Sequence, residues 1–138
     1  MTDDYLARIS DEKLALLLQA KGAVLIEGSK WCGKTSSAER KAKSVLYMQD
    51  TDTSKANILI TKTKPSLLLE GKTPRLLDEW QIAPELWNAV RFAVDKHHQK
   101  GQFILTSSVT PTRTKDMHTG TGRIAQMKMR TISLFETG

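Results

Sequence analysis

The 138-residue sequence has a single cysteine and no apolar run of membrane-spanning length. One thiol, Cys32, cannot form a disulfide within the chain. The longest apolar run, Leu14 to Leu18, is far shorter than the roughly 18 to 20 residues that a bilayer-spanning helix needs. The first residues, Met1 to Asp4, are acidic where a secretory signal is basic. We therefore expect a cytoplasmic protein with no membrane partner.

Internal repeats and low-complexity segments are also lacking, which excludes fibrous and low-complexity classes. With 39% apolar and 26% charged residues, the composition is that of a compact domain. The length predicts one domain over residues 1–138, with an N-terminal helix within 1–22 and a core over 23–138. The net charge of +6 favours an anionic partner, which can be a nucleotide, a nucleic acid or an acidic protein.

Short apolar clusters alternate with polar helical stretches, which is typical of an α/β fold. The clusters that we interpret as strands are 23–26, 44–49, 75–80, 102–107 and 123–129. We predict a helix capped by Ser10 and ending before Gly22, a short helix after Pro65, and a longer helix over 83–98. Residues 55–70 otherwise fit a helix or a strand. The first strand is continuously apolar, which predicts a doubly wound, largely parallel five-stranded sheet with helices on both faces.

A phosphate-binding pattern follows the first strand directly. Residues 28–35 read Gly-Ser-Lys-Trp-Cys-Gly-Lys-Thr and match G-x-x-x-x-G-K-[ST]. The glycines allow amide N–H groups to turn inward and bind an anion at a helix N-terminus. We predict that Lys34 contacts the β- and γ-phosphates of ATP and that Thr35 is a ligand of the bridging Mg²⁺. The nucleotide-binding residues are then Gly28, Ser29, Lys30, Trp31, Cys32, Gly33, Lys34, Thr35 and Ser36. The alternative, a tight glycine turn with a surface lysine, does not predict adjacent Lys and Thr.

Two carboxylates, Asp78 and Glu79, stand at the carboxyl end of the strand predicted over 75–80. Open parallel sheets bind their ligands at this edge. We assign Asp78 to Mg²⁺, commonly through water, and Glu79 to the general base that polarises the attacking water. Seen alone, such acids are more often solvated residues at a strand-to-loop transition. The preceding phosphate loop reverses that preference.

Strand 44–49 separates the phosphate-loop strand from the acid-bearing strand along the chain. This order is similar to that of the additional-strand catalytic-glutamate class of P-loop proteins. In that class a polar residue at the end of the next strand commonly senses the γ-phosphate or orients the water. The resemblance implies this role for Thr106, in preference to Ser107. The alternative is that Thr106 is an ordinary residue of a turn.

Four stretches resemble uncharacterised prokaryotic AAA-superfamily ATPases over nearly the whole chain: VLIEGSKWCGKTSSA, PRLLDEWQIAPELWNAVRFAVD, GQFILTSS and GTGRIAQMKMRTISLFE. The resemblance implies a longer C-terminal region in the relatives, so we expect a truncated member. It also implies a homo-oligomer in which a neighbouring subunit supplies an arginine to the γ-phosphate. Arg123 is the internal candidate for a charge-sensing arginine, or else a surface residue before the last strand. The pair Ser107-Ser108 replaces the Gly-Ser that these relatives often show.

We therefore predict Mg²⁺-dependent ATP binding and ATP hydrolysis. A second hypothesis is a non-catalytic, nucleotide-gated module that binds DNA or a protein. A basic surface for nucleic acid, or simply a solvated basic face, is offered by Lys62, Lys64, Lys72, Arg75, Arg113 and Lys115. A P-loop kinase is less favoured, because the short loops provide no obvious arginine-bearing lid.

Overall fold

The computed structural model describes residues 2–28, 34–108 and 124–129, with side chains for 11–28, 35–108 and 124–128. The elements in chain order are α1 (Thr2–Ala20), β1 (Ala23–Gly28), α2 (Lys34–Lys41), β2 (Ser44–Tyr47), α3 (Ser54–Thr63), the 3₁₀ helix η1 (Pro65–Leu69), β3 (Arg75–Asp78), the 3₁₀ helix η2 (Trp80–Ile82), α4 (Glu85–His97), β4 (Phe103–Ser108) and β5 (Ile124–Met129). Helices and strands alternate along the chain, which confirms the predicted α/β class.

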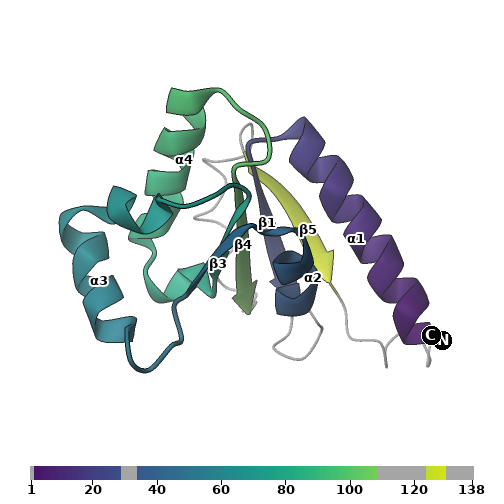
Figure 1. Ribbon diagram of the computed structural model, residues 1–138, viewed down its shortest axis with the longest axis horizontal. Coiled ribbons are helices and arrows are strands. Elements are labelled where there is room, and N and C mark those ends of the chain that lie inside the picture. Colours follow the sequence, from purple (N-terminus) through teal and green to yellow (C-terminus); the bar gives the residue numbers. More distant parts are fainter. Residues whose placement is uncertain (1, 29–33, 109–123, 130–138) are drawn as a thin grey trace.

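The described strands form one five-stranded sheet in the order β2-β3-β4-β1-β5, and every pair is parallel. Parallel neighbours require crossover connections, which place helices on the sheet faces. Figure 1 shows α1 and α2 on one side of the sheet and α3 and α4 on the other. The doubly wound sheet predicted from the sequence is therefore confirmed. In space, β4 lies between the phosphate-loop strand β1 and the acid-bearing strand β3, whereas β2 is at the edge.

Each face of the sheet buries its own apolar core, and β1 contributes to both. Val24 and Ile26 pack with residues of α1 and α2, whereas Ala23 and Leu25 pack with residues of η1 and α4. Successive side chains of a strand point to opposite faces, so a strand between two cores must be apolar at every position. The continuous apolar run in the sequence thus has a direct structural cause. Met127 of β5 is buried in the core on the α1 side.

The first helix is longer than its sequence signals predicted. α1 begins at Thr2, so Ser10 lies inside the helix and the prediction that it caps the N-terminus is wrong. The preceding residues include Leu6, Ala7 and Arg8, which favour helix, and Asp3 and Asp4 lie near its positive end. These propensities outweigh a single capping residue.

Residues 55–70, which fitted either a helix or a strand, form α3 and η1. Asn57 and Thr61 are one helical turn apart and both are buried, whereas Leu59 between them is 66% exposed. This spacing of buried side chains follows the helical period and not the alternation of a strand. The short helix predicted after Pro65 is confirmed as the 3₁₀ helix η1.

Gly22 lies where the turn between α1 and β1 passes against α4. A Cβ atom placed on Gly22 would be 2.3 Å from Cγ1 of Val94, a buried residue of α4. We predict that Gly22→Ala destabilises the fold by about 1–3 kcal/mol, because valine is stiff about χ1 and cannot simply rotate away. Urea unfolding measures this difference. The double variant Gly22→Ala/Val94→Ala should lose less than the sum of the single losses, and a Gly22→Ala protein as stable as the parent would contradict the predicted clash.

Candidate functional site

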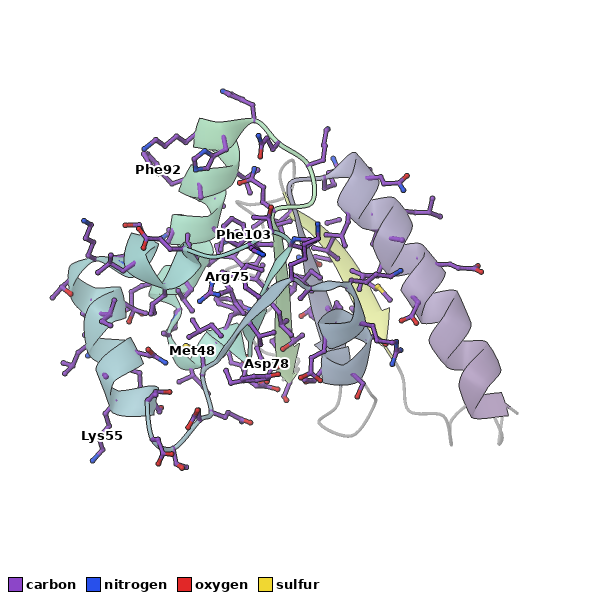
Figure 2. The ribbon with its side chains drawn as sticks, viewed as in Figure 1. Met48, Lys55, Arg75, Asp78, Phe92 and Phe103 are labelled. Atoms are coloured by element: carbon purple, nitrogen blue, oxygen red, sulfur yellow. The ribbon has the colours of Figure 1, made fainter. Side chains whose placement is uncertain are left out.

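Three residues that the sequence singled out meet at one carboxylate oxygen at the carboxyl edge of the sheet. Thr35 lies in the first turn of α2, Asp78 ends β3 and Thr106 lies in β4. The Thr35 hydroxyl donates to Oδ1 of Asp78 at 2.8 Å, and the Thr106 hydroxyl donates to the same oxygen at 2.7 Å. Figure 2 labels Asp78 at this end of the sheet, close to α2. The last residue of the phosphate-loop pattern therefore contacts the acidic strand end.

Strand register explains how residues distant in sequence reach one another. β3 and β4 pair in parallel with Leu77 beside Leu105, so the next residues, Asp78 and Thr106, are also neighbours. Asp78 shares a sheet face with Leu76, two residues earlier, which packs in the core on the α1 and α2 side. That face is the one on which α2 presents Thr35. Ser107, the alternative to Thr106, points to the opposite face by the same alternation.

Glu79 does not continue the strand. The prediction of a strand over 75–80 is wrong at its end, because β3 stops at Asp78 and Glu79 adopts a left-handed conformation with φ 58° and ψ 52°. Non-glycine residues rarely adopt this conformation. The Glu79 amide donates to the Thr106 hydroxyl at 2.9 Å, and the residue is only 4% exposed. Thr106 therefore links both acids, since its hydroxyl accepts from Glu79 and donates to Asp78.

Two residues that sequence reasoning missed contact the Glu79 carboxylate. Oε2 accepts from the side-chain amide of Gln81 at 2.6 Å and from the Ser108 amide at 3.2 Å. Oε1 accepts from the Ser108 hydroxyl at 2.9 Å. In the sequence, Ser108 stands out only as half of a Ser-Ser pair, and Gln81 only as part of a stretch that resembles the AAA ATPases. A polar residue two positions after the second acid was the one signal available for Gln81.

The remaining site predictions lie partly outside the described residues. Ser29, Lys30, Trp31, Cys32, Gly33 and Arg123 are not described, and neither is the side chain of Lys34. Gly28, the first residue of the pattern, is the buried last residue of β1, and Lys34 begins α2. Ser36 is an exposed residue of α2. The predicted strand before the pattern and the predicted helix at its end are therefore present.

Thr35 and Asp78 offer oxygen atoms as metal ligands at this edge. Within 11–28, 35–108 and 124–128, no group of three His, Cys, Asp or Glu side chains could hold a metal ion. Mg²⁺ at phosphate sites uses one or two protein ligands, with water and substrate phosphates completing the shell. The hydroxyl of Thr35 and the carboxylate of Asp78 have the hard-oxygen chemistry that such a site needs.

Tyr47 ends β2 beside Asp78 in the register of the sheet. Its hydroxyl donates to the Glu39 carboxylate of α2. This hydrogen bond, with a smaller contribution from burial, raises the pKa of Tyr47 to about 12. Tyr47 is neutral at physiological pH, as an ordinary tyrosine is, and adds no charge to the edge that carries Asp78.

This arrangement agrees with the comparisons to known proteins. A family model described as an AAA domain matches residues 20–138. The chain belongs to the AAA domain family. No curated protein matches the sequence significantly. Among solved structures, the chain is similar to that of C. elegans PCH-2, at 18% identity and a TM-score of 0.37, over 89% of this chain and 39% of that chain.

Membership in the AAA family confirms the predicted AAA-superfamily module and supports nucleotide binding. The chain spans well under half of the PCH-2 chain, so the activity and partners of a whole AAA protein are matters for proposal. Among the described helices, none is long and apolar enough to cross a bilayer.

Thr106 carries two of the contacts that connect the acids, so its hydroxyl can be tested by an isosteric change. Thr106→Val keeps the shape but leaves the buried Glu79 amide without its acceptor. We expect a loss of about 1–3 kcal/mol in the free energy of unfolding, measured in urea. Thr106→Ser retains the hydroxyl and should lose less. Equal stability of the valine variant and the parent would show that the hydroxyl does not hold this edge together.

Proposed function

We propose that this AAA domain binds ATP with Mg²⁺ and hydrolyses it to ADP and phosphate at the carboxyl edge of the sheet. The observation that carries the proposal is the meeting of Thr35 and Thr106 on one oxygen of Asp78. Thr35 belongs to the phosphate-loop pattern and Asp78 to the acidic strand end. These two elements have separate sequence signals, and a triphosphate site requires both at one place.

In this proposal Thr35 and Asp78 hold Mg²⁺, with Asp78 acting directly or through water. The bound cation supplies charge neutralisation for the β- and γ-phosphate oxygens. The hydrogen bond from Thr106 to Asp78 fixes the orientation of the carboxylate before the nucleotide arrives. Residues 28–36, including Lys34, bind the phosphates through the backbone amides and the lysine charge.

Glu79 is the proposed general base. The oxygen of a water attacks the γ-phosphorus, the bond from that phosphorus to the β–γ bridging oxygen breaks, ADP leaves, and the carboxylate takes the water proton. This role is supported by the position of Glu79, which directly follows Asp78 and is linked to it through Thr106. Thr106 is the proposed sensor of the γ-phosphate. Arg123 is the proposed charge-sensing arginine, unless a second copy of the chain supplies one.

One observation favours the second hypothesis, a nucleotide-gated binding module without catalysis. Both oxygens of the Glu79 carboxylate already accept hydrogen bonds, from Gln81 and Ser108. A carboxylate held in this way must give up one of these hydrogen bonds, or accept a further one from water, before it can take a proton from that water. Steady-state phosphate release at saturating Mg²⁺-ATP separates the hypotheses. Nucleotide binding with phosphate release supports the ATPase, binding without release supports the module, and absence of binding contradicts both.

A further inference from the structure

Lysines line the sheet edge opposite the proposed ATP site. Because all strands are parallel, the segments that lead into β1, β2, β3 and β4 lie at the same, amino edge. Each of these segments contains one lysine, and the strand order places them in the sequence Lys43, Lys72, Lys100 and Lys21. We call these four residues the lysine row. Strands lie about 4.7–4.9 Å apart, so the row extends on the order of 14 Å.

The charge at this edge is strongly one-sided. Lys41, which ends α2, and Lys96, in the last turn of α4, add two positive charges to this edge beyond those of the lysine row. The carboxylates of the segments at this edge are Glu70 and Asp95. The opposite edge carries carboxylates, which are Asp50, Asp52, Asp78 and Glu79. Figure 1 shows that α1 and α4, on opposite sides of the sheet, both end at the amino end of β1 and β4. An anionic partner at the lysine row would therefore not compete with the nucleotide.

Helix stabilisation explains only part of this pattern. Lysines near a helix C-terminus interact favourably with its negative pole, and Lys21 directly follows α1. Lys100 donates to the Ala20 carbonyl at 3.0 Å, which leaves further ammonium N–H groups for a ligand. Lys43 and Lys72 are exposed and lie in no last turn of an α-helix. Half of the row therefore has no role in capping.

An exposed aromatic ring lies on α4, the helix whose C-terminal end is at this edge. Phe92 of α4 is 70% exposed, and it precedes Lys96 by one helical turn. Figure 2 shows Phe92 on the side of α4 away from the sheet, near the helix end at the lysine edge. Proteins that bind single-stranded nucleic acids combine a positively charged track for the phosphates with aromatic rings on which bases stack. The described surface offers lysines at the amino edge of the sheet and an exposed ring on α4, the helix whose C-terminal end lies at that edge (Figure 1).

We propose that the amino edge of the sheet binds single-stranded nucleic acid, with the lysine row on successive phosphates and Phe92 stacked on a base. The row differs from the basic surface suggested by the sequence. Arg75 does not belong to it, because this residue is half-buried and its Nε donates to the Leu68 carbonyl at 2.8 Å. Of that earlier set, Lys72 alone is part of the row. The proposal does not depend on ATP hydrolysis.

Fluorescence anisotropy of the intact chain with a labelled oligothymidine of about 20 nucleotides tests the proposal, because one site covers about 4–16 nucleotides. We expect binding whose log Kobs falls with log salt at a slope of about −2 to −3, since each phosphate contact contributes about −0.7. The triple variant Lys43→Ala/Lys72→Ala/Lys100→Ala should bind at least about tenfold more weakly and reduce the slope to about −1. Phe92→Ala should weaken binding about fivefold or more without changing the slope.

The matched control Lys13→Ala/Lys55→Ala/Lys128→Ala removes the same charge from exposed positions on α1, α3 and β5, and should retain the parent affinity. Circular dichroism checks that each variant is folded. Any of four results would overturn the proposal. These are an equal loss of oligothymidine affinity in the control variant, an affinity for duplex DNA equal to that for oligothymidine, binding only to phosphatidylserine vesicles, and no binding at all. Lys34→Ala should bind the oligonucleotide normally, which separates this test from that of the ATP site.

Discussion

Lys34→Ala is expected to weaken Mg²⁺-ATP binding by about two orders of magnitude or more. Lys34 is the lysine of the phosphate-loop pattern and begins α2, six residues after Gly28 at the end of β1. Its ammonium is the one side-chain charge that this pattern directs to the β- and γ-phosphates. Removing one partner of a desolvated charge pair costs about 2–5 kcal/mol, and each 1.4 kcal/mol is tenfold in affinity. Isothermal titration calorimetry with Mg²⁺-ATP measures the change.

A matched control for this variant is Lys55→Ala. Lys55 is an exposed lysine of α3, so its removal changes the net charge equally without touching the proposed site. It should bind ATP like the parent, and the thermal midpoints of both variants should stay close to that of the parent. If Lys34→Ala binds ATP as tightly as the parent does, the phosphate-loop assignment is wrong.

Glu79→Gln is expected to lower the rate of phosphate release by about 10²–10⁴ while leaving the Kd for ATP unchanged, because a carboxamide cannot accept the water proton. The structure indicates that the substituted side chain fits. Its oxygen can replace Oε2, which accepts from Gln81 and from the Ser108 amide. Its NH₂ can replace Oε1 and donate to the Ser108 hydroxyl. The loss would therefore report on basicity and not on misfolding.

Glu85→Gln provides the control for this second prediction. Glu85 is an exposed carboxylate in the first turn of α4, so the change is chemically the same at a neighbouring position. Phosphate release by this variant should match that of the parent. A Glu79→Gln protein that turns over ATP at the parent rate would remove Glu79 as the base. In that case the proton would have to go to another group or directly to solvent.

The sequence alone determined features that are encoded locally. The phosphate-loop pattern at 28–35 needs only its own glycines, lysine and threonine. The apolar run of β1 predicted a strand covered on both faces, because such a strand has no polar side. Local signals failed where two of them competed. Helix propensity in residues 2–9 outweighed the capping signal of Ser10, and 55–70 became helical, with Asn57 and Thr61 one turn apart on the buried side of α3.

The tertiary structure alone decided how these local features meet. The contacts from Thr35 and Thr106 to Asp78 join positions 43 and 28 residues apart, and they depend on the pairing of β3 with β4 and on α2 covering that face. The left-handed turn at Glu79, which Gln81 and Ser108 surround, follows no local propensity of glutamate. The lysine row likewise exists only because parallel strands bring four separate segments to one edge. Sequence patterns specify short-range conformation, whereas strand order and register are set by long-range packing.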